Sequence, residues 1–337
     1  MKNKIRLLAK ISGILLLGLG TAAAAESGPK KILVVTVTTG FRHSSIETAE
    51  KVLAKLGKDS GAFTVEYVRQ PGSQPNPPEK PGAPTRPVEP QRDADDAKYQ
   101  AALDKYQRDL EKFPAAETKF KTDLEKFTAE EPQRTAAFKV ADAEWRVKLT
   151  NQLARLAPES LKNFDAVIFA NTTGDLPLPD NDAFINWVKE GHAFIAMHSG
   201  SDTFHGYRPY VEMLGGEFEI HHAQVAIDAI NQDRDHPACR HLDPTWQIFD
   251  EIYLFQNFKR SAVHGLLTIP HHPNDKTKAG DYPVAWCKEF GQGRVFYTSL
   301  GHREDVWENP IYQVHVLNGI KWALGLMPGG GKPQLTY

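Results

Sequence analysis

The sequence predicts an α/β fold with a doubly wound, mostly parallel sheet at its centre. Runs of apolar and β-branched residues at 32–37, 63–68, 166–170 and 193–197 have the length and composition of buried strands. Segments of helical periodicity separate several of these runs. Because strands joined by crossover helices pair in parallel, this alternation predicts a sheet with helices on both faces.

Three segments carry the helical pattern most clearly. Residues 46–56, 183–189 and 310–324 place apolar side chains three and four positions apart, and the last segment has enough of them to cover one face of the sheet. Ser44 and Glu47 have the spacing of a capping box, which predicts that a helix begins there. The three residues before Ser44 therefore lie on a loop between a strand and a helix.

The C-terminal half is expected to form a mixed sheet edge. Strand patterns at 224–230 and 251–255 lack crossover helices, and those at 283–290 and 294–300 flank a glycine-rich turn.

Composition excludes one class of partner. The chain has 337 residues, 40 of them Lys or Arg and 42 Asp or Glu. Four of the basic residues lie in the first ten positions, so that without them 36 basic face 42 acidic residues. A protein that binds nucleic acid through phosphate contacts needs the opposite balance.

The first 25 residues have the pattern of a secretory signal peptide. Positions 1–10 are basic, 11–20 are apolar, and 21–25 are small and end before Glu26. The alternative is a membrane anchor, but the apolar run is too short to cross about 30 Å of hydrocarbon. We therefore expect a secreted or periplasmic protein without a stable membrane anchor after cleavage. Cys239 and Cys287 remain in the mature chain, and the sequence leaves open whether they pair.

The middle of the chain divides the α/β domain, which we assign to residues 26–70 and 151–328. Residues 71–91 are rich in proline and predict a linker, and 92–150 predict a helical insertion. An aromatic residue recurs there every seven positions, at Tyr99, Tyr106, Phe113, Phe120 and Phe127. We expect this insertion to fold back on its own domain, with Pro114 and Pro132 kinking or ending its helices. The alternative is an arm that makes a homo-oligomer.

Polar clusters follow several of the predicted strands. Ligands in open α/β sheets bind beyond the carboxyl ends of the strands, so these loops should share one edge. We expect His198 to act as a general base oriented by Asp202, with His43 and His302 as donors and Glu251 as a reserve acid.

The surrounding residues suit a small carbohydrate. Acidic and imidazole groups handle hydroxyl protons, and aromatic faces cover the C–H groups of a sugar ring. Trp286 and Trp307 are the rings available for stacking. The predicted substrate-binding residues are Arg42, Asp250, Tyr253, Trp286, His221 and Arg303.

A metal site is an alternative use of the same histidines. Neutral imidazoles of His43, His198 and His302, together with Glu251 or Asp202, can bind zinc or another divalent ion. The sequence has no HExxH motif, so metal binding is the less favoured interpretation and no cofactor is assigned.

A set of motifs resembles the ThuA-like family, named for trehalose utilisation. The resemblance covers residues 31–70 and 160–325, and it implies the class I glutamine amidotransferase-like fold, a flavodoxin-like sheet. His198 stands where true amidotransferases have a nucleophilic cysteine, so thiolate chemistry is not expected. The motifs are Gly40-Phe41-Arg42-His43, His198-Ser199, Gly215-Gly216 with Phe218 and His221, Asp250-Glu251 with Tyr253, Ala285-Trp286, and residues 293–302.

The resemblance implies work on trehalose-related disaccharides or their 3-keto derivatives. One hypothesis is an exported enzyme that hydrolyses or isomerises a glycoside or keto-sugar. A keto group near the glycosidic carbon acidifies a neighbouring hydrogen, so an imidazole base can begin an elimination without the paired carboxylates of ordinary glycosidases. The other hypothesis is a non-catalytic protein that binds carbohydrate at the same edge.

Overall fold

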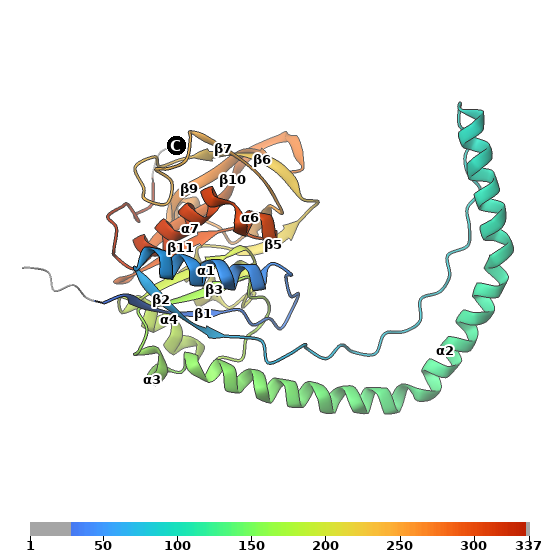
Figure 1. The fold of residues 1–337 in the computed structure, drawn as a ribbon, viewed down its shortest axis with the longest axis horizontal. Coiled ribbons are helices and arrows are strands. Elements are labelled where there is room, and N and C mark those ends of the chain that lie inside the picture. Colours follow the sequence, from blue (N-terminus) through green and yellow to red (C-terminus); the bar gives the residue numbers. More distant parts are fainter. Residues whose placement is uncertain (1–27, 335–337) are drawn as a thin grey trace, which may run out of the picture.

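The computed structural model describes residues 28–334, and the predicted signal peptide lies outside them. A nine-stranded sheet forms the centre of the molecule, in the order β2-β1-β3-β4-β11-β10-β9-β6-β7. Figure 1 shows this sheet with helices packed against it and one long helix that projects away. The strands are β1 (Lys30–Val35), β2 (Phe63–Val68), β3 (Ala166–Ala170), β4 (Ala193–Met197), β6 (Val225–Asn231), β7 (Thr245–Asp250), β9 (His264–His272), β10 (Asp275–Phe290) and β11 (Gly293–Thr298).

The sheet is parallel in one part and antiparallel in the other. Strands β2, β1, β3, β4 and β11 pair in parallel, which confirms the predicted α/β class. From β11 onward, β10, β9, β6 and β7 pair antiparallel, as expected for a mixed edge.

Two details of this edge differ from the sequence prediction. Residues 251–255 are not one strand, because β7 ends at Asp250 and β8 (Tyr253–Gln256) pairs instead with β5 (Glu217–His221) in a second, two-stranded sheet. The strand expected at 283–290 begins earlier, because β10 starts at Asp275 and pairs with β9, whose last residues are His271 and His272.

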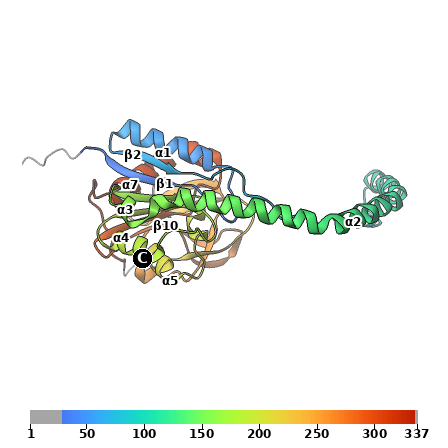
Figure 2. The ribbon, with the colours of Figure 1, turned by 90° about the horizontal axis from the view of Figure 1, so that it is seen from below.

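Helices cover both faces of the parallel part (Figure 2). Ile32 and Val34 of β1 pack in one core with α1 (Ile46–Ser60) and α7 (Pro310–Ala323). Leu33 and Val35 face the other core, which includes residues of α4 (Asn181–Lys189) and α5 (Arg208–Leu214). Because successive side chains of a strand point to opposite faces, an unbroken apolar run fills both cores. The short helices are α3 (Pro158–Leu161), α6 (Glu304–Glu308) and the 3₁₀ turns η1 (Ala154–Leu156), η2 (His198–Asp202) and η3 (Arg260–Ala262).

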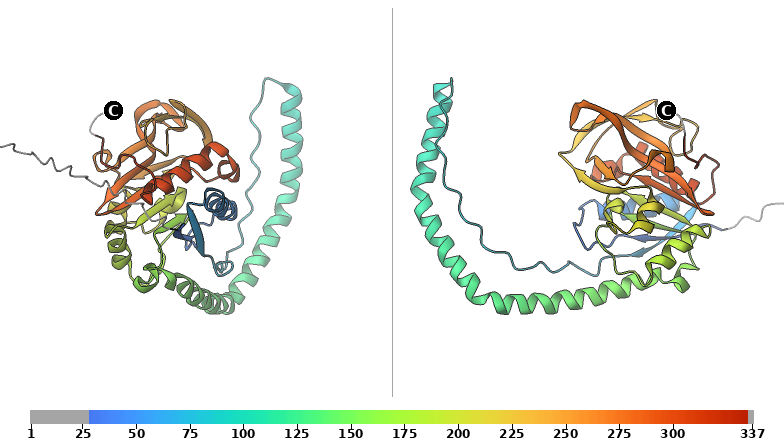
Figure 3. Two further views of the ribbon diagram at one scale, coloured as in Figure 1. Left: turned by 60° about the vertical axis from the view of Figure 1, so that its left-hand side comes forward. Right: turned by 180° about the vertical axis from the view of Figure 1, so that it is seen from behind.

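Helix α2 (Asp96–Leu153) is a single helix of 58 residues. Only its C-terminal part reaches the core, through Trp145, Leu149 and Leu153, while the rest extends away from the sheet (Figures 1 and 3). The expectation that this segment folds back on its own domain is therefore wrong for most of its length. These three buried side chains are four positions apart and therefore lie on one side of the helix. In the N-terminal turns of α2, charged residues stand between the aromatic ones.

The prolines of α2 do not end it. Pro114 and Pro132 both lie inside the helix, which curves along its length in Figure 1. The proline-rich segment runs back beside the helix, since Pro84 and Pro90 line the same groove as Tyr106 and Phe113. Within residues 28–334, no helix has the length and apolarity needed to cross a bilayer.

The capping box is not formed. Helix α1 starts at Ile46 after Ser45, which makes no side-chain cap, and the Ser44 hydroxyl donates instead to Glu304 at 2.5 Å. The Ser45 hydroxyl donates to the Gly301 carbonyl at 3.2 Å, so the two serines tie the start of α1 to the first residue of α6 and to the loop before it.

Candidate functional site

Four side chains far apart in the sequence meet at one edge of the parallel sheet. His43 follows β1 and precedes α1, His198 follows β4 directly, and His302 follows β11. These three strands are parallel, so their carboxyl ends lie at the same edge. Glu251 joins them from the connection between β7 and β8.

His198 lies at the centre of this group. Its Nε2 is 3.2 Å from Nε2 of His43, 3.3 Å from Nδ1 of His302 and 3.6 Å from Oε2 of Glu251. The same Glu251 oxygen is 3.1 Å from His302 Nδ1. We call His43, His198, His302 and Glu251 the histidine–glutamate cluster. Its four facing atoms all lie within 4.8 Å of one another.

The backbone at His198 is strained. Its φ is +46°, in the left-handed region that non-glycine residues rarely adopt, and the side chain is fully buried. Tyr297 donates to the His198 carbonyl at 2.8 Å, and Ser201 donates to the same oxygen at 3.2 Å. The surrounding structure therefore holds a sharp turn that aims the imidazole at its neighbours.

Asp202 does not orient His198, contrary to the sequence prediction. His198 Nδ1 donates to the Ser299 carbonyl at 2.8 Å, while Asp202 pairs with His205. A main-chain carbonyl only accepts, so Nδ1 carries the proton and Nε2 presents its lone pair to the cluster. Sequence patterns miss this partner, since a backbone carbonyl leaves no residue-type signal.

The two buried histidines of the cluster are neutral at neutral pH. Burial, together with the charge of His302, lowers the pKa of His43 to about 4. Burial and the neighbouring His43 lower the pKa of His198 well below its usual value. At His302, burial opposes protonation, but the hydrogen bond and charge of Glu251 outweigh it and raise the pKa.

Asp250 supports the main chain next to the cluster rather than binding a substrate. It is fully buried, and its carboxylate accepts hydrogen bonds from the main-chain nitrogens of Glu251 at 2.9 Å and Gly301 at 2.7 Å. Burial raises its pKa to about 6. Gly301 has φ of +114°, and a Cβ there would lie 2.9 Å from the Tyr312 hydroxyl. The predicted role of Asp250 in positioning a sugar ring is therefore wrong.

Of the other predicted binding residues, the structure brings two to the cluster. His221 Nδ1 lies 2.9 Å from Oε1 of Glu251, and the Tyr253 ring lies 4.2 Å from the ring of His198 between centroids. Arg42 turns away and donates to the Thr36 carbonyl at 2.8 Å. Arg303 pairs with Asp305 through two 2.8 Å hydrogen bonds.

The predicted stacking tryptophans belong to the core. Trp286 and Trp307 are both fully buried, and their indole nitrogens donate to the carbonyls of Leu214 and Gly301. An aromatic group that sequence reasoning did not assign to the site is Phe41, which is 68% exposed and packs edge-on against His43 with centroids 4.9 Å apart. Its position in the Gly40-Phe41-Arg42-His43 motif was the available signal.

The cysteines take no part in the site. Cys239 and Cys287 are free and buried, and burial raises the pKa of both thiols. Neither lies at the turn after β4, where His198 stands.

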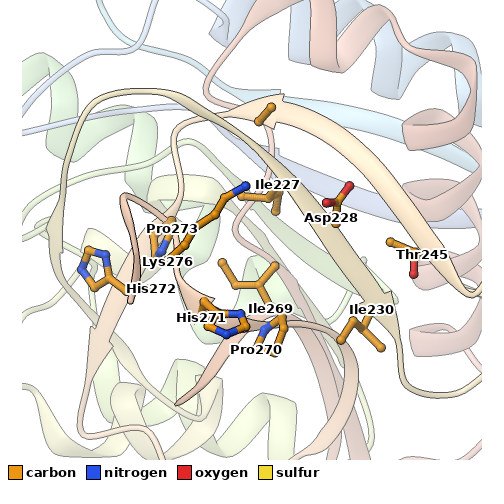
Figure 4. Close-up of a pocket in the computed structure, with 11 residues that line it drawn as sticks. Ile227, Asp228, Ile230, Thr245, Ile269, Pro270, His271, His272, Pro273 and Lys276 are labelled. Atoms are coloured by element: carbon orange, nitrogen blue, oxygen red, sulfur yellow. The ribbon is translucent and has the colours of Figure 1, made fainter. Parts of the chain in front are cut away.

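An open cavity of about 380 Å³ lies on the antiparallel part of the molecule (Figure 4). It is lined by residues of β6, β9 and β10, among them Asp228, His271 and Lys276, and by none of the histidine–glutamate cluster. We place the functional site at the cluster because convergent imidazoles and a carboxylate can transfer protons or bind a cation, whereas this cavity presents only dispersed polar groups.

The fold and the cluster define an α/β protein with a histidine–carboxylate centre at the carboxyl end of a parallel sheet. Residues 116–323 match the family model ThuA, described as trehalose utilisation, and the chain belongs to this family. The match begins inside α2 and leaves out residues 31–70, although β1 pairs with β3 in the same sheet.

Two solved structures share the fold. A ThuA-like protein from Bacteroides uniformis is 14% identical, with a TM-score of 0.52 over 90% of this chain and 94% of that one. A ThuA-like protein from Parabacteroides merdae is 15% identical, with a TM-score of 0.54 over 88% of this chain and 90% of that one. No curated protein matches the chain.

Proposed function

We propose that the protein is an exported enzyme that hydrolyses or isomerises a glycoside or keto-sugar of the trehalose-related class. The observation that carries the proposal is the convergence of His43, His198, His302 and Glu251 at one sheet edge. Membership of a family described as trehalose utilisation supports the substrate class. The flavodoxin-like arrangement of the parallel strands is part of the same proposal.

The chemistry we propose begins with proton removal from a keto-sugar. A base takes the hydrogen from the carbon that lies between the carbonyl and the glycosidic carbon. The released electron pair forms a carbon–carbon double bond and expels the glycosidic oxygen, which takes up a proton. Addition of water across the double bond then completes hydrolysis. If the enolate is instead protonated at a neighbouring atom, the product is an isomer.

The cluster suits this reaction electrostatically. His198 presents an unprotonated Nε2 in a buried position, and His302 lies beside Glu251 and holds its proton more tightly than a free imidazole. A base and an acid with different proton affinities therefore lie 3.3 Å apart. Because His198 is fully buried, its Nε2 can exchange a proton only with a group that lies at the centre of the cluster and not with bulk solvent.

The test is sugar turnover with a matched control. Trehalose, other disaccharides and their 3-keto forms are incubated with wild type, His198→Ala and His271→Ala, and free sugar and remaining keto-sugar are measured. His271 is exposed and lies outside the cluster. We expect turnover by wild type and His271→Ala and a loss of at least about 100-fold in His198→Ala. Equal rates in all three proteins would remove His198 from the mechanism.

A non-catalytic carbohydrate-binding protein is the second candidate. The burial of His43 and His198 favours it, because buried imidazoles are reached only by a substrate that enters the cluster closely. This function predicts that His198→Ala weakens sugar binding while no protein forms product from any sugar in the set.

We also propose that α2 associates with a second copy of the chain. The proline-rich segment covers the helix near Tyr106 and Phe113, whereas Phe120, Leu124 and Phe127 further along are only half-buried. These three side chains continue the seven-residue pattern on one side of the helix, which favours pairing between helices.

Export after cleavage at Ala25 is likewise proposed. It predicts that protein recovered from the periplasm or medium begins at Glu26, which N-terminal sequencing tests.

A further inference from the structure

We propose that His43, His198, His302 and Glu251 are the ligands of a divalent transition-metal ion. The inference deepens the proposed function, since it rests on the same site, but it is tested without any substrate. Three observations support it: the distances between the four facing atoms, the placement of protons among them, and the outer hydrogen-bond partners of three of the ligands.

The spacing agrees with ligands around a small cation. Zinc binds imidazole nitrogen at about 2.0–2.1 Å and carboxylate oxygen at about 2.0–2.2 Å, so neighbouring ligand atoms of a tetrahedral site lie about 3.3–3.5 Å apart. The observed separations are 3.2 Å for His43–His198, 3.3 Å for His198–His302, 3.1 Å for His302–Glu251 and 3.6 Å for His198–Glu251. All other separations in the cluster are below 4.8 Å. An ion therefore fits with small movements of the side chains.

Hydrogen bonds alone leave one pair of acceptors facing each other in the cluster. His198 Nε2 has a lone pair and no proton, because Nδ1 donates to the Ser299 carbonyl. Both His43 Nε2 and His302 Nδ1 face this one lone pair, and so does the Glu251 oxygen, which is itself an acceptor when ionised. His43 Nε2 can donate to this lone pair and His302 Nδ1 can donate to Glu251, which leaves the His198 nitrogen and the Glu251 oxygen 3.6 Å apart as two acceptors with no proton between them. A metal ion satisfies all four atoms together.

Three of the four ligands are held by a second group, as metal ligands usually are. His198 donates its other ring nitrogen to the Ser299 carbonyl, and His43 Nδ1 lies 3.3 Å from the Ser199 hydroxyl. His221 Nδ1 lies 2.9 Å from the outer oxygen of Glu251. Such partners fix the ring orientation and the tautomer that exposes the binding nitrogen.

The fold also makes the ligands rigid. His198 and His302 follow adjacent parallel strands, and the buried Asp250 binds the main chain beside both Glu251 and His302. Because the ligands come from separate loops, the site contains no local motif such as HExxH, although the sequence predicts three of its histidines at one edge of the sheet. Four protein ligands would complete a tetrahedral shell, so a water or a substrate carbonyl would bind the ion only as a fifth ligand, where the ion would lower the pKa of that water or polarise that carbonyl. The lone pair of His198 would then hold the ion, so the base of the proposed reaction would be that water.

The experiment measures binding of Zn²⁺ to the full mature chain. Protein purified without chelator is analysed for metals, stripped by dialysis against a chelator, and titrated with ZnCl₂ by calorimetry. We expect one equivalent of metal per chain and an increase in melting temperature on rebinding. Wild type that binds no metal in either measurement would overturn the inference regardless of any variant.

Variants locate the ion. His198→Ala and Glu251→Gln should weaken Zn²⁺ binding by more than about 100-fold, since changes to outer partners alone cost about 10–100-fold. His271→Ala, an exposed histidine outside the cluster, should bind like wild type and corrects for adventitious sites. Circular dichroism of each stripped variant establishes that it is folded. Equal Zn²⁺ affinity in Glu251→Gln, His198→Ala and His271→Ala would overturn the inference.

The result is separable from the proposed function. Zinc bound at the cluster without conversion of any sugar leaves the metal site in place and removes the enzymatic proposal. Sugar turnover by wild type that binds no Zn²⁺ in either measurement removes the metal site and leaves the enzymatic proposal.

Discussion

Asp250→Asn is the sharpest test of how the cluster is positioned. The Asp250 carboxylate is fully buried and uses its two oxygens on two different main-chain N–H groups, one at Glu251 and one at Gly301. An amide of the same shape has one acceptor oxygen and one NH₂ group. One of the two N–H groups therefore loses its partner and faces another donor.

The expected cost follows from that lost acceptor. A buried donor left without a partner costs about 1–3 kcal/mol, and the donor–donor contact adds to it. We therefore expect the free energy of unfolding to fall by about 2–3 kcal/mol. Because either the Glu251 or the His302 loop must shift, Zn²⁺ affinity should also fall by about 10–100-fold.

Denaturant unfolding of metal-free protein measures the first effect, and calorimetric titration measures the second. Asp243→Asn makes the same chemical change at an exposed aspartate and is the matched control. Its free energy of unfolding should lie within about 0.5 kcal/mol of the wild-type value. A denaturation midpoint for Asp250→Asn equal to that of Asp243→Asn, with an unchanged slope, would refute the positioning role.

Two further predictions concern stability and assembly. Burial lowers the pKa of His315 to about 3 while the unfolded imidazole titrates near 6.5, so the unfolded state binds one more proton there, and this group lowers stability by about 1.4 kcal/mol per pH unit below about pH 6. His315→Asn, which can keep the hydrogen bond to the Ala238 carbonyl, should reduce the slope of unfolding free energy against pH between about pH 6 and pH 4 by about that amount, and an unchanged slope would contradict this. For the α2 proposal, sedimentation velocity should give a dimer for wild type and for the exposed change Thr122→Glu but a monomer for Phe120→Glu; a monomeric wild type would exclude the association.

Much of the fold followed from short-range patterns. The unbroken apolar runs at β1, β3 and β4 indicated strands buried on both faces, and helices α4 and α7 had apolar spacing that matched their later packing. The path of α2 could not be predicted in this way, because a seven-residue repeat of apolar residues indicates which side of a helix is apolar but not what packs against it.

Part of the candidate site could also be predicted from the sequence. The convergence of His43, His198 and His302 was expected from their positions after parallel strands, and the structure brings them together. Asp202 and Trp286 were assigned by residue type, and both have other partners, His205 for the carboxylate and the Leu214 carbonyl for the indole. Residue type indicates what a group can do, whereas its burial and neighbours determine what it does.

The amino-acid sequence alone determined the α/β class, the strand-end placement of three histidines and the resemblance to the ThuA family. The first two depend on local periodicity and on the rule that parallel strands share their carboxyl edge, whereas the resemblance depends on the motifs themselves. Only the tertiary structure decided that Glu251 completes the cluster, that a main-chain carbonyl sets the tautomer of His198, and that Asp250 holds two loops in place. Apart from the bond between the adjacent residues Asp250 and Glu251, those hydrogen bonds join residues 51 and 101 positions apart. Their geometry depends on the packing of the whole domain, where shifts of a few tenths of an ångström matter.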